Sequence, residues 1–321
     1  MQIHTIDREE MPLRQHFFVA GAICRVSTNS PAIMNALWQW RCSHDAAGVR
    51  SFNLDVRVGS LGDRTDHGTP HFRGRDHLVF ATFSDRDLFV FDLCRRSVVG
   101  FVSKQTAEDR RFWTTLLIPI ALGVLGPAIG LVPVHAACLD WNGKGLMIAG
   151  ASGAGKSTLA VALSQRGFSL LSDDWTYVAQ EGPSVTAYGI SAPVKLLADA
   201  PLFFPELSRF EPAKSLNGEM AFEVDAGWTF GSPVQSQSNP SWLVLLERVA
   251  QTGCEMARLV GDNMWTFFER NLERLPATLA ETDVRRSETI AELTKKDCWL
   301  LRYGGPPQIA AEALRQFCEG M

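Results

Sequence analysis

A phosphate-binding loop is the clearest chemical signal in the sequence. The pattern GxxxxGK[ST] is matched by Gly150, Ala151, Ser152, Gly153, Ala154, Gly155, Lys156 and Ser157, with Thr158 directly after it. In such a loop, backbone N–H groups and the positive end of the following helix face an anionic phosphate. Lys156 is expected to reach the β- and γ-phosphates, and the Ser157 hydroxyl to ligate Mg²⁺. We therefore predict that residues 150–158 bind a nucleotide, with ATP and Mg²⁺ as the cofactors.

Two adjacent acids follow the loop after a short stretch of chain. Asp173 and Asp174 end a predicted strand one helix after the loop, and this position would bring them beside the phosphates. One carboxylate can hold Mg²⁺ while the other accepts the proton of an attacking hydroxyl. The structural alternative is that one aspartate caps a turn and the other is solvated. The short spacing from the loop favours a chemical role for the pair.

His135 precedes the loop at the start of a predicted strand. A lone histidine at a strand end is more often structural than catalytic. The residue type and position alone therefore leave its role open.

These side chains need a scaffold, and the sequence around the loop predicts one. Residues 135–141 and 145–150 are apolar runs joined through Asn142-Gly143, the preferred type I′ hairpin turn. A helix is expected over 156–165, with Gly167 as its stop, followed by a strand over 168–174. A second hairpin is expected from 176–180 and 184–188.

The flanking regions read as a mixture of strands and helices. Strands are predicted over 16–26, 51–59, 77–83, 87–93, 240–249 and 298–303, and helices over 31–41, 263–275, 284–296 and 308–321. Residues 59–77 are polar and glycine-rich, so we expect a long loop. Its histidines (His67, His71, His77) lack a metal-ligand spacing, and a solvated loop is the better interpretation.

One uncharged segment, 112–134, is long enough to cross a bilayer. Three prolines and three glycines interrupt it, and the loop that follows must pack in water. A buried helix that breaks near Gly126-Pro127 is therefore favoured over a membrane span.

Composition narrows the class of protein. The net charge is −4 without a long run of like charge, which argues against nucleic-acid and membrane partners. Seven cysteines occur without a CxxC motif, and residues 1–14 contain no apolar signal core, so we expect reduced thiols and a cytoplasmic protein.

The run HAACLDWNGKGLMIAGASGAGKSTLAVALSQRGFSLLSDDWTYV resembles the bacterial HPr serine kinase/phosphorylase family. In that family a histidine opens a hairpin, a phosphate loop follows, and a helix ending in Arg-Gly leads to two aspartates. The matching positions here are His135, residues 150–157, Arg166-Gly167 and Asp173-Asp174. The resemblance implies an α/β fold with α+β character: a P-loop kinase core of the HPr kinase/PEP carboxykinase type with a mixed sheet, over residues 111–321. Residues 1–110 would form a separate β-rich N-terminal domain.

The resemblance also implies roles. Asp174 would be the catalytic base toward the acceptor hydroxyl, and Asp173 would join Ser157 in holding the metal. Lys156 would act on the phosphate, and His135 would lie beside it and tune the base. Since the related kinases are often hexamers, the resemblance also implies a homo-oligomer.

The sequence departs from the family at two places. Thr158 stands where the true HPr kinases have a glutamate, and the stretch AYGISAPVKLL offers Lys195 in place of an acidic metal ligand. Both departures count against phosphorylase activity and against HPr itself as the substrate. Lys195, Arg209 and Lys214 are candidates for clamping a phosphate or an acidic acceptor, although most such side chains are merely solvated.

The favoured function is a kinase that transfers the γ-phosphate of ATP to a hydroxyl of a protein, a peptide or a small molecule. A metabolite kinase would also carry an aspartate one helix after the loop, but the upstream histidine hairpin and the doubled aspartate count against it. A nucleotide-binding regulatory or maturation protein without turnover is the third possibility. A generic ATPase motor fits less well because no distant apolar strand ending in Asp-Glu is present.

Overall fold

The computed structural model describes residues 11–42, 50–59, 70–190, 192–215, 218–272 and 274–321. Its contacts divide the chain into two compact units. The first comprises residues 1–131 and 274–285, and the second comprises residues 132–273 and 286–321. Residues 111–131, which we predicted to be part of the kinase core, thus lie in the first unit.

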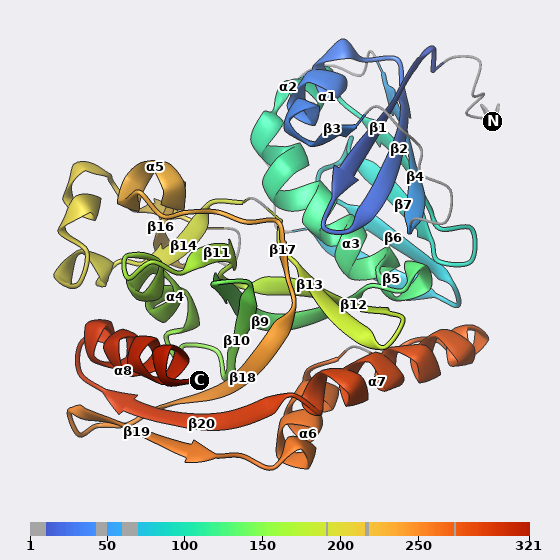
Figure 1. Ribbon diagram of the computed structural model, residues 1–321. Helices are drawn as coiled ribbons and strands as arrows, with labels where there is room; N and C mark the ends of the chain where they lie inside the picture. The colour runs from blue at the N-terminus through green and yellow to red at the C-terminus, as the bar shows by residue number, and fades with distance from the viewer. Residues whose placement is uncertain (1–10, 43–49, 60–69, 191, 216–217, 273) are drawn as a thin grey trace. The chain divides into compact units, whose positions relative to one another are not determined.

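The first unit is built on an eight-stranded mixed sheet (Figure 1). In spatial order its strands are β3 (Arg41–Cys42), β1 (Leu13–Val19), β2 (Ala22–Thr28), β4 (Ser51–Val58), β8 (Ser97–Val102), β7 (Leu88–Asp92), β6 (Leu78–Thr82) and β5 (His71–Arg75). Strands β2, β4 and β8 are parallel, and the other neighbours are antiparallel. The short helices of this unit are α1 (Pro31–Ala36), η2 (Trp38–Trp40) and α2 (Lys104–Glu108).

The uncharged segment is a buried helix, as predicted. It begins as a π-helical turn, η3 (Phe112–Leu117), continues as α3 (Ile118–Leu125), and gives way to the 3₁₀ turn η4 (Pro127–Ile129). Trp113, Leu117 and Leu122 are fully buried in it. In the described residues, none of the helices combines the length and the apolar character that crossing a membrane requires.

Three predicted elements in this unit are wrong or incomplete. Residues 16–26 are not one strand but the hairpin β1–β2, because Ala20 (φ 45°) and Gly21 (φ 77°) form a tight turn. Part of the predicted loop forms strand β5, while residues 60–69, His67 among them, lie outside the described residues. The helix predicted over 31–41 stops at Ala36 and continues only as the 3₁₀ turn η2.

The second unit contains a nine-stranded mixed sheet. Along its main path the order is β17 (Gln237–Ser238), β13 (Ser184–Tyr188), β12 (Trp175–Glu181), β9 (Val132–Trp141), β10 (Lys144–Gly150), β18 (Pro240–Arg248), β20 (Asp297–Gly304) and β19 (Gly253–Arg258), and β11 (Ser169–Ser172) also pairs with β9. Strands β10, β18 and β20 are parallel to one another, so their carboxyl ends meet at one edge. The mixed α/β architecture with a β-rich N-terminal part confirms the predicted fold class.

Alternation along these strands fills two cores, one on each face of the sheet. Leu146 and Ile148 of β10 face the helices α4 (Lys156–Ser164) and α8 (Pro307–Gly320), which pack against each other. Met147 and Ala149 face the opposite core, which includes residues of α6 (Gly261–Asn271) and α7 (Ala280–Thr294). The sheet therefore lies between two helical layers. The phosphate loop connects β10 to α4 and so leads to the helical layer that contains α4.

The remaining elements are small. A three-stranded sheet consists of β14 (Val194–Leu197), β16 (Met220–Val224) and β15 (Ala213–Lys214), and short helices are η5 (Ala200–Leu202), η6 (Pro205–Arg209), α5 (Ala226–Phe230) and η7 (Ala277–Leu279). The helix predicted over 263–275 ends at Asn271, and the one predicted over 284–296 begins four residues earlier as α7.

Candidate active site

The predicted site residues meet at one edge of the second sheet. The hairpin β9–β10 has the predicted turn, with Asn142 and Gly143 at φ 53° and 85°. Because β9 is antiparallel to β10, the start of β9 lies beside the end of β10, and His135 is next to the position that pairs with Ala149. Strand β11 also runs antiparallel to β9 and delivers Asp173 and Asp174 to the same edge.

The phosphate loop has the backbone geometry that its glycines predict. Gly153 (φ 77°) and Gly155 (φ 92°) adopt left-handed conformations that other residues rarely take. Gly155 is the N-cap of α4 and has no side chain with which to cap the first turn of that helix. The N-terminal N–H groups of α4 therefore lack a cap from their own N-cap residue and point to where an anion can bind.

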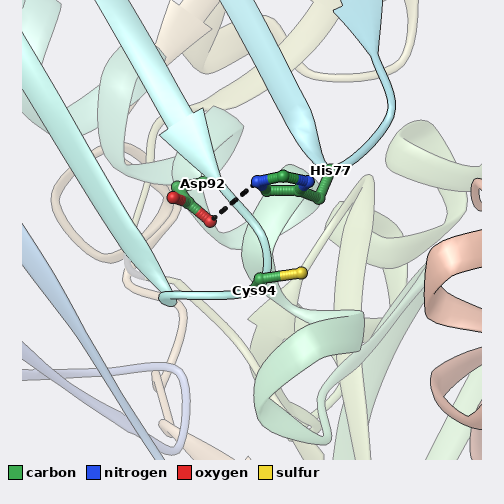
Figure 2. A group of neighbouring side chains, drawn as sticks. All are labelled: His77, Asp92 and Cys94. Carbon is green, nitrogen blue, oxygen red and sulfur yellow. Dashed lines mark ion pairs between the residues drawn. The ribbon is translucent and has the colours of Figure 1, made fainter.

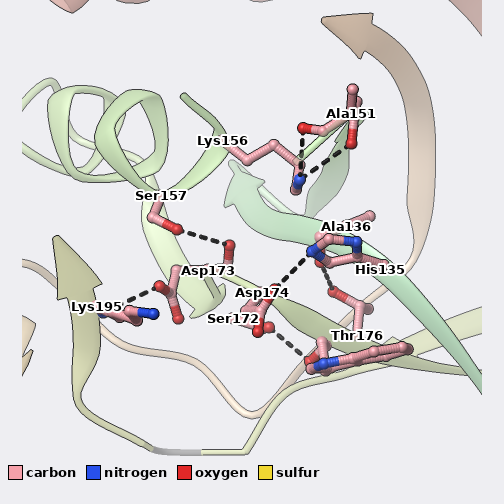
Figure 3. Close-up of polar contacts among 12 residues, drawn as sticks. His135, Ala136, Ala151, Lys156, Ser157, Ser172, Asp173, Asp174, Thr176 and Lys195 are labelled. Carbon is pink, nitrogen blue, oxygen red and sulfur yellow. Dashed lines mark hydrogen bonds and ion pairs between the residues drawn. The ribbon is translucent and has the colours of Figure 1, made fainter. Parts of the chain in front are cut away.

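Lys156 lies across the mouth of its own loop (Figure 3). Its Nζ donates to the carbonyl oxygens of Gly150 at 3.0 Å and Ala151 at 3.3 Å. Burial lowers the pKa of Lys156, and the negative charges of Asp174 and Asp173 oppose that shift. The ammonium group is thus close enough to both acids to feel their charge, and a phosphate could replace its carbonyl partners.

Asp173 is the partly buried member of the acid pair. Its Oδ2 accepts a hydrogen bond from the Lys195 backbone N–H at 3.2 Å, and its backbone oxygen accepts one from Ser157 Oγ at 3.4 Å. Desolvation, with the charge of Asp174 as a second cause, raises the pKa of Asp173 to about 7. A carboxylate whose charge is disfavoured in this way is suited to a cation, and Ser157 supplies a hydroxyl beside it. The residues present thus fit Mg²⁺, with Ser157 and Asp173 as the groups that would hold it.

Asp174 is exposed and paired with His135. The histidine Nε2 lies 2.8 Å from Asp174 Oδ1, and the Asp174 side chain keeps 56% of its surface accessible. The indole of Trp175 stacks on the imidazole with ring centroids 5.4 Å apart, and strand pairing places Trp175 opposite His135. His135 is therefore held from two sides, and the carboxylate that it orients remains open to an incoming acceptor.

Sequence reasoning missed the supports of this site. Trp175 carries no motif, and its contact with His135 depends on the register between β12 and β9. Lys195 touches the site through its backbone N–H, while its ammonium pairs with Glu219 at 2.7 Å. Arg209 lies over the rings of Phe210 and Trp228 instead of at the loop. Strand register places Lys195 opposite Glu223, and Glu219 lies just before β16, so no sequence pattern indicates the Lys195–Glu219 pair.

A second group of potential ligands lies in the first unit (Figure 2). One atom each of His77, Asp92 and Cys94 lies within 4.8 Å of the others. Asp92 Oδ1 also accepts the backbone N–H of Arg95 at 2.9 Å, and the Leu93 N–H donates to the His77 carbonyl at 3.0 Å. These contacts join two β-turns and explain the grouping without an ion. We therefore assign no function to it.

Comparisons with known proteins bear on the second unit. Residues 131–195 match the family described as HPr Serine kinase C-terminal domain. The search of curated proteins gave no significant match. Among solved structures, the Hpr(Ser) kinase/phosphatase from Coxiella burnetii is similar with 16% identity over 59% of this chain and 97% of that chain, but the TM-score of 0.31 is too low to carry an argument.

The matched segment runs from the start of β9 to Lys195 and contains the loop, both aspartates and His135. Residues 131–195 are thus similar to the C-terminal domain of the HPr serine kinases, which confirms the resemblance predicted from the sequence.

Proposed function

We propose that the chain is an ATP- and Mg²⁺-dependent phosphotransferase that moves the γ-phosphate to a hydroxyl group. The acceptor would be a serine of a protein or peptide, or a small molecule. The single observation that carries this proposal is the His135–Asp174 pair at the mouth of the phosphate loop, with its carboxylate exposed and close enough to influence the Lys156 ammonium electrostatically.

The proposed reaction is a single displacement at the γ-phosphorus of ATP. The acceptor oxygen forms a bond to the γ-phosphorus, the bond from that phosphorus to the bridging oxygen breaks, and ADP leaves with the electron pair. Asp174 takes the hydroxyl proton as the new bond forms, so a free alkoxide never accumulates. His135 keeps the receiving oxygen oriented, and Trp175 keeps the imidazole in place.

The phosphate loop supplies charge neutralisation. Its N–H groups and Lys156 face the β- and γ-phosphates, where negative charge shifts toward the leaving oxygen. Bound Mg²⁺, held by Ser157 and Asp173, would neutralise phosphate charge. Most of the catalysis is thus positioning, and a well-placed site needs few reacting side chains.

The test is transfer of label from γ-labelled ATP with Mg²⁺ to the proteins and peptides encoded beside this chain, with Asp174→Asn as the variant. We expect Asp174→Asn to bind ATP within about twofold of the unsubstituted chain and to lose transfer by about 10²–10⁴-fold. The exposed Asp199 gives the control Asp199→Asn, which should change neither quantity.

Two results would contradict the proposal. If the Asp174→Asn variant transfers phosphate as fast as the unsubstituted chain, Asp174 is not the catalytic base. A chain that binds ATP, labels no acceptor, and keeps its effect in cells after Asp174→Asn but not after Lys156→Ala would be a nucleotide-binding regulator. Label appearing only on a small metabolite would agree with the proposal and would identify the acceptor as a small molecule.

A further inference from the structure

Arg248 ends strand β18 on the side of the phosphate loop away from the two aspartates. Strand pairing places Leu246 beside Gly150, and a Cβ on Gly150 would lie 2.9 Å from the Leu246 carbonyl oxygen. Arg248 is two residues further along the strand, so its side chain is on the same face as Leu246, the face of α4 and the loop. On this face of β18, Arg248 is therefore the first exposed side chain after the buried Leu246.

The guanidinium of Arg248 is supported as a flat surface. Its Cζ lies 4.4 Å from the ring centroid of Tyr303, which is buried, and Nη1 donates to the Gly305 carbonyl oxygen at 3.2 Å. In the part of the chain that the structure describes, no carboxylate pairs with Arg248. The ring of Tyr303 thus lies beside the guanidinium, while the Arg248 side chain as a whole remains exposed.

Tyr303 links this arginine to the loop itself. A Cβ on Gly155 would lie 2.7 Å from the Tyr303 hydroxyl oxygen, so the phenol touches the backbone directly before Lys156. The same strand end carries the Gly304-Gly305 turn, where Gly305 has φ 81°. The carboxyl ends of β18 and β20 thus form a second flank of the loop, beside the one formed by His135 and Asp174.

A nucleotide whose phosphates bind the loop has its terminal phosphoryl group and its nucleoside at opposite ends of the phosphate chain. If the terminal phosphoryl group faces Asp174, as in the proposed function, the nucleoside lies toward β18 and β20. We propose that the guanidinium of Arg248, supported by Tyr303, is the stacking surface for the nucleobase. This inference rests on the proposed function for its direction. A planar cation over an aromatic ring can stack a base on its free face and does not need a particular base edge.

The experiment compares two ligands that share phosphates but differ in the nucleoside. Binding of Mg-ATP and of Mg-tripolyphosphate is measured by calorimetry for the unsubstituted chain, Arg248→Ala and Arg248→Lys. Stacking predicts that both variants weaken ATP binding by about tenfold and leave tripolyphosphate binding within about twofold. The control is Arg302→Ala, an exposed arginine on β20 that pairs with Glu247 at 3.0 Å and should change neither ligand.

Three results would overturn the stacking role. Equal loss for both ligands would make Arg248 a phosphate contact, full retention in Arg248→Lys would make it a simple charge, and no change in either variant would remove it from the site. Failure of the proposed function would give a different result. If the Arg248 variants weaken ATP binding selectively but the chain transfers no phosphate, the stacking role stands and the proposed kinase activity is refuted.

Discussion

The two flanks of the phosphate loop differ in what holds their exposed charge. On the acidic flank, Asp174 is paired with an imidazole that Trp175 supports. On the basic flank, Arg248 lies on the ring of Tyr303 and has a carbonyl partner. Each flank thus presents an exposed charged group beside an aromatic ring, and of the two groups compared only the Asp174 carboxylate can accept a proton. We therefore expect Asp174 to act in the reaction and Arg248 to act in nucleotide binding, and the variants below test this difference.

The loop between the flanks should show the largest effect. Lys156→Ala removes the ammonium that would face the β- and γ-phosphates, so we expect ATP binding to weaken by about 100-fold or more and transfer to fall below detection. Calorimetry with Mg-ATP measures the first quantity and γ-label the second. Lys144→Ala is the matched control, because Lys144 is exposed at the far end of β10 and its Nζ lies over Trp242. ATP binding that survives in Lys156→Ala would contradict the site.

Loss of the His135 imidazole should lower the rate of phosphate transfer and leave ATP binding almost unchanged. His135→Ala is expected to lower the transfer rate by about 10–100-fold, because Asp174 loses its orientation, while KM for ATP changes by less than about twofold. His135→Gln retains an N–H donor and should recover part of the rate. A rise in KM with an unchanged rate would instead place His135 among the nucleotide contacts.

The contact between loop and basic flank can be isolated with two glycines. Gly153 and Gly155 both have positive φ, but only a Cβ on Gly155 meets a neighbour, the Tyr303 hydroxyl. Ala at either position should cost about 1 kcal/mol for the backbone, with a further loss of about 1 kcal/mol for Gly155→Ala. Urea unfolding measures both. Equal losses would show that Tyr303 does not restrict the loop.

Asp173 should make the stability of the chain depend on pH. Its pKa is raised from 3.8 to about 7, so between these values the folded chain binds a proton that the unfolded chain does not. Stability from this group is therefore present at low pH and is lost as the pH rises through 7. Without Mg²⁺, Asp173→Asn should gain about 1–2 kcal/mol over the unsubstituted chain between pH 5 and pH 8. Urea unfolding at the two pH values measures this gain, and an equal difference at both would show that Asp173 is not desolvated.

Sequence reasoning performed best where local chemistry decides the structure. The hairpin before the loop, the helix after it and the buried helix over 112–125 follow from Asn-Gly, glycine and proline preferences that act within a few residues. The pairing of the strands could not be predicted from the sequence. The turn at Ala20-Gly21 lacks the usual Asn-Gly signal, and β5 (HFRGR) is exposed along its whole length, with Phe72 as its one large apolar residue.

The same limit applies to the candidate site. The phosphate loop, the aspartates and His135 carry a recognisable spacing, and the structure brings them to one sheet edge. Trp175 and Tyr303 carry no such pattern, because each owes its place to a neighbouring strand far away in the chain. Supporting residues of this kind are fixed by register, which a single sequence does not reveal.

Residues 274–285 belong to the first unit although they follow most of the second. The chain therefore passes between the units three times, and α7 begins in one unit and ends in the other. A single cut after residue 131 would separate the first unit from residues 274–285 and would leave those residues attached to the second unit. To separate the two units, residues 274–285 would have to be removed from the second unit and joined to the first. The two units are therefore not modules that a simple gene fusion could exchange.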